Sequence, residues 1–440
     1  SGHVVSACKL ARNLNSKSLR DKSARQIAWE LLYEIDNSEL YSNLVVPRTL
    51  SSSSLEARDR ALVTNLVYGT LRMRGFLDGA IRKYLDRELT SVDLKVLTVL
   101  RMGAYQLLIL KTPVHAAVNE IVDLAKVVCG KSAASYVNAV MRRLSENLDV
   151  SPASMSEEYS HPEWVINAFK DSLKDEALVK RQLEANNEIA LPTLVCWPDR
   201  STHEELLAAG ASMIPGTLNA FSFKGNPGDI PAIRERRAGV QDLGSQIVAE
   251  TFVATKSENH PLRWLDLCAG PGGKAAYMES LLPEDELVVN EPTQVRANLL
   301  AQVVKRSKVE SFDGRQIPVQ LGLFDRILVD APCTGLGALR RRPEVRWRRK
   351  PSDLRALVEL QQDLLESAAT RVNVGGIIGY ATCSPHIAET KMQVNDFLKR
   401  HPNFNRLIIG PRGDNDGDLQ LWTFRDGTDC MYLSLLERQS

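Results

Sequence analysis

The chain has 440 residues, more than one ordinary domain needs, so we expect two or three domains. Hydrophobic residues make up 44% and charged residues 25%, which is typical of a folded soluble protein and excludes a disordered chain. The net charge of +1 excludes a broadly basic protein, so any nucleic acid must be bound by a local patch of positive charge.

Cysteine usage and hydropathy indicate the cellular setting. The seven cysteines are scattered without CxxC pairs, which predicts neither a disulfide framework nor a zinc site, and we expect no metal. No apolar run approaches the roughly 20 residues that a membrane span needs. Ser6, Cys8 and Lys9 interrupt the apolar residues at the start of the chain, which is not typical of a signal peptide. We therefore expect a cytoplasmic protein without a membrane partner, and nothing demands more than a monomer.

Residues 20–145 are predicted to form a bundle of helices. Apolar residues recur there with helical spacing, as at Ile27, Leu31 and Ile35. Five or more such stretches joined by short loops favour an all-α domain. A stretch rich in Ser, Asn and Pro at 145–156 is typical of a linker.

The rest of the chain predicts two further domains. Residues 157–245 favour a small α+β subdomain, in which helical stretches precede a strand at Thr193–Cys196. Strands and helices then alternate through 246–440, which predicts a parallel sheet covered by helices on both faces. The strands of this sheet are expected at Arg263–Leu267, Leu287–Val289, Phe324–Val329 and Ile377–Tyr380. The predicted fold class is therefore α/β.

The end of the chain departs from this alternation. Leu419–Phe424 and Cys430–Leu436 flank Asp426-Gly427, which predicts an antiparallel hairpin. A doubly wound, Rossmann-like sheet that ends in such a hairpin resembles the outline of the class I methyltransferases that use S-adenosylmethionine.

A glycine-rich loop lies where the first strand of the sheet turns into the first helix. Glycines let the backbone approach a ligand closely, and a helix N-terminus offers free N–H groups. A turn that uses glycine only to bend is the alternative; a P-loop is not expected, because its GxxxxGK[ST] spacing is missing. Glu291 follows roughly 20 residues later, where a doubly wound fold places a carboxylate for a ribose, unless it is simply an acid at a helix start. The candidate cofactor residues of the loop are Cys268, Ala269, Gly270, Pro271, Gly272, Gly273 and Lys274.

Two cysteines and an aspartate follow neighbouring strands. Asp330 and Cys333 come directly after one buried strand and Cys383 after the next, at the sheet edge where open α/β folds place active sites. Cytosine C5 is a poor nucleophile until a thiolate adds to C6, and the adduct needs an acid near N3 and a base for the C5 proton. Asp330 suits the N3 role, one cysteine suits the attack, and the other could assist release. A lone cysteine is more often a small buried hydrophobe, and spacing alone does not say which one attacks.

Taken together, these motifs resemble the RNA cytosine-C5 methyltransferases of the Sun/Nop2 group. The likeness is greatest to the bacterial RsmB (Sun, Fmu) type, which acts on 16S ribosomal RNA. The cofactor motif at Asp266–Lys274, the DAPC motif that ends at Cys333 and the TCS motif around Cys383 carry the resemblance, which covers nearly the whole chain. The N-terminal helices resemble the RNA-binding protein NusB through segments such as Val67–Arg72 and Pro113–Glu120.

This resemblance implies S-adenosylmethionine as cofactor, S-adenosylhomocysteine as product and RNA as partner. It assigns Cys383 as the nucleophile and Cys333 to release, and it assigns Asp313 of a DGR motif to the adenine. Asp330 counts as both a catalytic and a cofactor residue. The chain departs from the family after the TCS motif, where only Glu389 remains of an acidic pair.

A basic cluster directly after the Cys333 loop is predicted to contact RNA phosphates, although a solvated helix face is the usual role of such a run. Its members are Arg340, Arg341, Arg342, Arg346, Arg348, Arg349 and Lys350. The expected function is methylation of C5 of a cytosine in 16S ribosomal RNA. The alternatives are the same chemistry on transfer RNA, a non-catalytic RNA-binding or assembly factor, and a Rossmann oxidoreductase.

Overall fold

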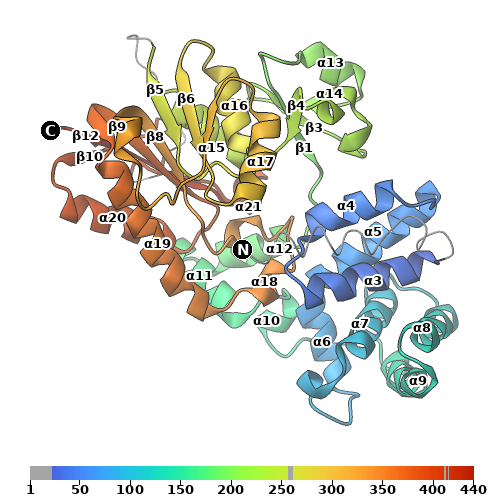
Figure 1. The fold of residues 1–440 in the computed structure, drawn as a ribbon. Helices are drawn as coiled ribbons and strands as arrows, with labels where there is room; N and C mark the ends of the chain where they lie inside the picture. The colour runs from blue at the N-terminus through green and yellow to red at the C-terminus, as the bar shows by residue number, and fades with distance from the viewer. Residues whose placement is uncertain (1–21, 256–260, 411–412, 415) are drawn as a thin grey trace. The chain divides into compact units, whose positions relative to one another are not determined.

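The computed structural model describes residues 22–440 except 256–260, 411–412 and 415. The chain forms two compact units (Figure 1). The first contains the residues up to Asn167 together with Arg341–Arg348; the second contains 168–340 and 349–440. A short segment of the C-terminal half of the sequence therefore belongs to the N-terminal unit.

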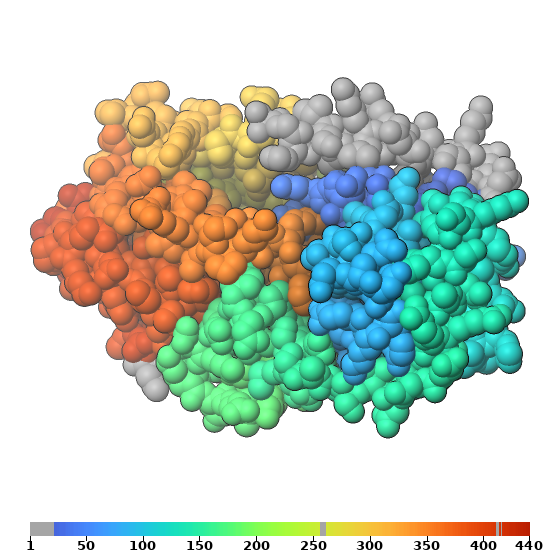
Figure 2. Space-filling model, turned by 90° about the horizontal axis from the view of Figure 1, so that it is seen from below, coloured from blue at the N-terminus to red at the C-terminus, as the bar shows by residue number. Residues whose placement is uncertain are grey.

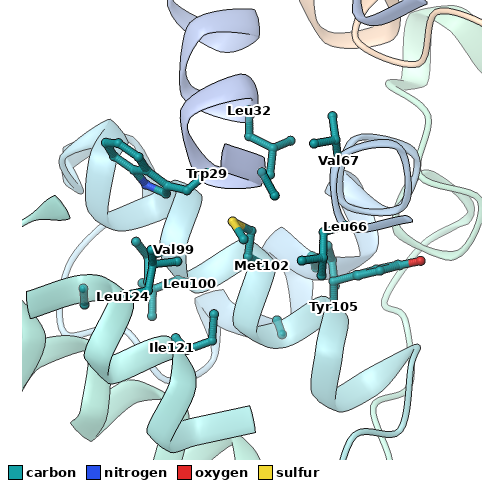
Figure 3. Close-up of a cluster of buried hydrophobic side chains, with 14 of the residues drawn as sticks. Trp29, Leu32, Leu66, Val67, Val99, Leu100, Met102, Tyr105, Ile121 and Leu124 are labelled. Atoms are coloured by element: carbon teal, nitrogen blue, oxygen red, sulfur yellow. The ribbon is translucent and has the colours of Figure 1, made fainter. Parts of the chain in front are cut away.

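The N-terminal unit is helical, as predicted. Its helices are α3 (Ala24–Asn37), α4 (Ser42–Ser51), α5 (Ala57–Arg72), α6 (Arg74–Arg82), α7 (Leu94–Leu108), α8 (Val114–Val128), α9 (Lys131–Ser145), α10 (Met155–Glu158) and the inserted α18 (Val345–Arg348). α7 is almost entirely buried and packs against α3, α5, α6, α8 and α9. Leu100 and Met102 of α7 meet Leu66 of α5 and Ile121 of α8 in the shared core (Figure 3).

The boundary between the units falls within α11 (Glu163–Leu173), and α12 (Glu176–Ala185) and a small sheet follow in the second unit. The strands of this sheet are β1 (Thr193–Cys196), β2 (Ser212–Met213), β3 (Ala220–Ser222) and β4 (Ala238–Val240), in the order β2-β3-β1-β4. α13 (His203–Ala208) and α14 (Pro231–Arg234) contribute Leu206 and Ala232 to its core.

The large sheet has the order β10-β12-β9-β8-β5-β6-β7. Its strands are β5 (Arg263–Asp266), β6 (Glu286–Asn290), β7 (Lys308–Glu310), β8 (Phe324–Asp330), β9 (Val372–Thr382), β10 (Phe404–Leu407) and β12 (Tyr432–Arg438). β5, β6, β7, β8 and β9 are parallel, whereas β12 pairs antiparallel with both β9 and β10. The predicted parallel sheet with an antiparallel end is thus confirmed.

Helices cover both faces of the large sheet (Figure 1). α15 (Leu243–Val253), α16 (Gly273–Leu281) and α17 (Gln294–Val303) bury apolar side chains on one face. α19 (Pro351–Ala369) and α20 (Lys391–Arg400) do so on the other. The opposite side of α19 faces solvent (orange in Figure 2).

The predicted Asp426-Gly427 hairpin turn is wrong in its detail. β11 (Leu419–Gln420) does pair antiparallel with β12, but α21 (Thr423–Asp426) lies between them. Gly427 has a φ of 68° and ends this short helix as a left-handed C-cap, a role that the Asp-Gly pair serves as well as a two-residue turn.

Candidate active site

The predicted site residues gather at the carboxyl edge of the parallel strands. β5 lies between β6 and β8, and β9 lies beside β8 with Asp330 opposite Ala381. The loops after β5, β8 and β9 therefore start side by side, and these loops carry the glycine-rich sequence, Cys333 and Cys383.

Two glycines of the loop after β5 make room for what surrounds them: Gly270 for the Glu291 carboxylate, and Gly272 for a left-handed backbone. A Cβ on Gly270 would lie 2.0 Å from Oε2 of Glu291, and Gly272 has a φ of 115°. α16 begins directly after it, at Gly273. The guanidinium of Arg296 donates to the carbonyl of Gly270 at 2.5 Å and lies 3.5 Å from the Glu291 carboxylate. Loop, helix N-terminus and acid thus form one continuous cradle.

Glu291 lies within this cradle, only 2% exposed. Its Oε1 accepts a hydrogen bond from the amide of Thr293 at 3.0 Å, so the carboxylate is held at the start of α17. This local bond and a ribose contact are compatible, because the second oxygen faces Gly270 and Arg296. A nucleoside cofactor fits the loop and this acid.

Asp313 lies on the loop after β7. Its carboxylate binds Arg315 at 2.6 Å, and this hydrogen bond lowers the pKa of Asp313. Both side chains are about half exposed, so the pair is open to an incoming ligand.

A charged cluster joins β5, α16 and β8. Nζ of Lys274 donates to Oδ2 of Asp330 at 2.8 Å. Burial opposes the ammonium of Lys274, but Asp330 outweighs burial and the pKa of Lys274 is raised. Asp266 lies nearby, 1% exposed; burial first and then Asp330 raise the pKa of Asp266 to about 7. Asp266 is a member of the site that the sequence analysis did not single out, although it opens the cofactor motif.

The two predicted catalytic cysteines lie side by side. Their sulfurs are 3.4 Å apart, and both residues are half-buried. The hydrogen bond to Cys383, followed by burial, raises the pKa of Cys333 well above its usual range. The structure thus brings together Cys333, Cys383, Lys274 and Asp330, which come from the first turn of α16, the end of β8 with the loop after it, and the loop after β9.

Backbone hydrogen bonds fix the Cys333 loop against the end of β9. The amide of Gly337 donates to the carbonyl of Cys383 at 2.9 Å, and the amide of Cys430 donates to the carbonyl of Gly337 at 2.9 Å. A Cβ on Gly337 would lie 2.1 Å from the carbonyl of Cys430, so this approach requires glycine. The loop has little freedom to carry Cys333 away from Cys383.

The basic cluster is divided between different environments. Arg346 is fully buried and donates to the carbonyls of Arg72 and Ser160 at 3.1 and 3.2 Å. Arg348 donates to the carbonyls of Ile35 and Leu40, and Arg342 lies over the ring of Tyr41. These three arginines hold residues 341–348 within the N-terminal unit. Arg346 is buried too deeply to reach a phosphate, so its prediction as an RNA contact is wrong, whereas Arg342 and Arg348 are partly exposed and their contact with RNA stays a prediction.

The remaining basic residues lie nearer the solvent. Arg340 is partly exposed and donates to the carbonyl of Gly427 at 2.7 Å. Arg341 and Arg349 are partly exposed, and Lys350 is exposed at the start of α19. A contact of Arg340, Arg341, Arg349 and Lys350 with RNA stays a proposal.

The structure was also searched for a metal site and for a membrane-spanning helix. Among the described residues, no group of three or more His, Cys, Asp and Glu could hold a metal ion. No helix of the described ranges is long and apolar enough to cross a membrane.

Comparisons with known proteins agree with this arrangement. The chain matches the family model of the 16S rRNA methyltransferase RsmB/F over residues 252–437 and that of the NusB family over residues 22–146. A putative methyltransferase of Mycobacterium tuberculosis is 38% identical, with 94% of this chain and 96% of the relative covered. Ribosomal RNA small subunit methyltransferase B of Vibrio cholerae is 30% identical, with 95% and 98% covered.

Solved structures show the same fold at lower identity. The crystal structure of PH0851 has a TM-score of 0.80 at 21% identity and covers 95% of this chain and 99% of its own. The structure of NSun6 from Pyrococcus horikoshii with SFG has a TM-score of 0.56 at 14% identity, and covers 63% of this chain and 98% of its own.

Proposed function

Because the chain belongs to the RsmB/F family of S-adenosylmethionine-dependent 16S ribosomal RNA methyltransferases, we propose that it methylates C5 of a cytosine in that RNA through a covalent bond between Cys383 and C6. The observation that carries this proposal is the pair of thiols 3.4 Å apart beside the Lys274–Asp330 pair. Two cysteines and an acid at one sheet edge are the groups that this reaction needs.

The first step makes C5 nucleophilic. The thiolate of Cys383 adds to C6, and the electrons of the C5–C6 double bond move toward N3, which takes up a proton through Asp330. The ammonium of Lys274, hydrogen-bonded to Asp330, supplies this proton: the carboxylate receives it from Lys274 and passes it to N3. The cradle of Gly270, Gly272 and Glu291 would hold S-adenosylmethionine, which would supply the electrophilic methyl group for C5 and leave as S-adenosylhomocysteine.

The second step releases the RNA. Cys333 first loses its own proton to solvent and then, as a thiolate, takes the proton from C5; the electrons of that C–H bond re-form the C5–C6 double bond, and the C6–S bond breaks. Cys383 leaves as a thiolate, and N3 returns its proton to Asp330. The short distance between the two sulfurs favours this division of roles, because the C5 proton and the C6–S bond lie on neighbouring ring atoms.

Methyl-labelled S-adenosylmethionine and 16S ribosomal RNA that lacks the modification test this proposal. We expect one labelled 5-methylcytosine with the unaltered protein, none with Cys383→Ala, and a stalled protein–RNA adduct with Cys333→Ala. Cys129→Ala removes a half-buried thiol of the N-terminal unit and serves as the control with unchanged activity.

Three outcomes would contradict parts of the proposal. Labelling of transfer RNA in place of ribosomal RNA would refute the substrate and leave the chemistry. Full activity of Cys383→Ala would refute the covalent mechanism. If S-adenosylmethionine binds but no RNA is labelled, the chain is better described as an RNA-binding factor.

A further inference from the structure

Glu389 ends the 3-10 turn Ile387–Glu389 between β9 and α20, in the segment where the chain departs from the family pattern. It is fully buried and accepts hydrogen bonds from three neutral donors. These are the amide of Thr334 at 2.8 Å, the hydroxyl of Thr334 at 2.5 Å and the side-chain amide of Gln361 at 3.1 Å. A buried carboxylate is costly unless such donors satisfy it, so its retention here calls for a reason.

These hydrogen bonds involve the residues on both sides of Cys333 in the sequence. Thr334, which binds Glu389 twice, directly follows Cys333. Gln361 on α19 also donates to the carbonyl of Pro332, which directly precedes it, at 2.9 Å. The backbone on each side of the thiol is therefore fixed to one carboxylate or to its hydrogen-bonding partner.

The same network reaches the Cys383 loop. The hydroxyls of Thr334 and Ser384 lie 3.1 Å apart, and Ser384 directly follows Cys383. The hydroxyl of Tyr380, on β9, donates to the carbonyl of Glu389 at 2.8 Å. Glu389 thus connects the two cysteine-bearing loops behind the sulfurs.

We propose that Glu389 is a positioning residue for the cysteine pair: it holds Cys333 at the distance from Cys383 at which Cys333 can take the C5 proton and release the RNA. This role rests on the proposed covalent mechanism and deepens it, since Glu389 itself touches neither RNA nor cofactor.

Charge supports the geometric argument. After the hydrogen bond to Cys383 and burial, the Glu389 carboxylate is a further cause of the raised pKa of Cys333. It therefore disfavours a thiolate at Cys333 in the resting protein, so that Cys333 starts the cycle protonated.

Glu389→Gln tests the role, because it keeps the shape and places an amide where Oε1 or Oε2 accepted a donor. Glu279→Gln is the control for the loss of a buried carboxylate elsewhere: Glu279 is 1% exposed, pairs with Arg200 and accepts amide hydrogen bonds from Lys305, Arg306 and Ser307, all outside the cysteine loops. If Glu389→Gln does not fold, Thr334→Val takes its place, because it removes the bridging hydroxyl. Thr334→Ser keeps that hydroxyl and is the control.

Two readouts separate positioning from general stability. The first is the rate at which iodoacetamide alkylates Cys333 in the RNA-free protein, located by mass spectrometry. The second is the rate at which the protein–RNA adduct breaks down after a single turnover. We expect Glu389→Gln and Thr334→Val to alkylate Cys333 several-fold faster and to release RNA about tenfold more slowly, a part of what a positioned base supplies. Thr334→Ser and Glu279→Gln should match the unaltered protein, and the Kd for S-adenosylmethionine should change less than about twofold in every variant that folds.

Unchanged alkylation of Cys333 together with unchanged adduct breakdown in Glu389→Gln would overturn the proposal. So would a loss of activity that only follows the folded fraction and is shared by Glu279→Gln. Full activity of Cys383→Ala refutes the covalent mechanism instead, and the alkylation rates then decide by themselves whether Glu389 positions Cys333.

Discussion

Among single residues, Asp266 has the most unusual chemistry of the cofactor site. It ends β5, is buried, and its pKa of about 7 places its ionisation inside the physiological range. Burial and Asp330 favour the neutral form, whereas Lys274 favours the carboxylate. A cationic ligand in the adjoining loop adds a second positive charge and shifts the balance toward the carboxylate.

We predict that the affinity for S-adenosylmethionine falls as the pH is lowered through 7. Below the pKa of the free protein, binding must remove a proton from Asp266, which weakens affinity by up to about tenfold per pH unit. Calorimetric titration between pH 5.5 and 7.5 measures this slope and the protons released. Asp266→Asn should bind more weakly at pH 7.5 and lose the slope; a slope that survives in this variant would contradict the assignment.

The proximity of the proposed catalytic residues was easier to predict from the sequence than the partners that hold the segments around them. Cys333, Cys383 and Asp330 follow strands directly, so strand pairing alone brings them together. The partners of Arg346, in contrast, are carbonyls of Arg72 and Ser160, far away in the sequence. A run of arginines has the same pattern whether it is solvated or buried, and only the three-dimensional structure distinguishes the two.

Among the elements, strands with an uninterrupted apolar run were predicted well, whereas a three-residue strand and a strand interrupted by glycines were not. β8 and β1 lie where their patterns indicate, whereas β7, Lys308–Glu310, is too short to show a period. β9 begins at Val372, five residues before the predicted Ile377, because Gly375 and Gly376 interrupt the apolar run while a bulge keeps the pairing with β8. The strand ends that carry the site were unaffected by these errors.

We predict that the loop between Cys333 and α18 does not tolerate a larger residue at Gly337. Gly337→Ala places a methyl group 2.1 Å from the carbonyl of Cys430 and 2.8 Å from that of Cys383, so the loop must move. We expect a loss of about 1–3 kcal/mol of stability in thermal or denaturant unfolding. Methylation should fall further than the folded fraction, since the moving loop carries Cys333.

Gly228→Ala is the control for this substitution, because its new methyl group would meet nothing closer than 3.5 Å. It should change stability by less than about 0.5 kcal/mol. Equal losses of activity in the two variants would show that the close approach at Gly337 does not matter for Cys333.

At the scale of the whole molecule, the connectivity links the two units. The chain passes from the N-terminal unit to the second, returns for Arg341–Arg348, and passes back again. Within the N-terminal unit, Glu344 accepts hydrogen bonds from the amide and hydroxyl of Ser42 at 2.9 and 2.7 Å. The N-terminal helices therefore complete their packing with a segment that directly follows the Cys333 loop in the sequence.

This connectivity predicts that Arg346, which binds α18 to the N-terminal helices, supports both folding and catalysis. Arg346→Met leaves the buried carbonyls of Arg72 and Ser160 without this donor, which should cost about 2–4 kcal/mol of stability. Hydrogen exchange, followed by mass spectrometry, should then rise in the N-terminal helices and in residues 333–340, with slower methylation. Arg355→Met, at a side chain that is 89% exposed, removes an arginine of α19 and should change neither stability nor exchange. Faster exchange confined to the N-terminal helices would mean that the inserted segment stabilises its own unit without constraining the loop that carries Cys333.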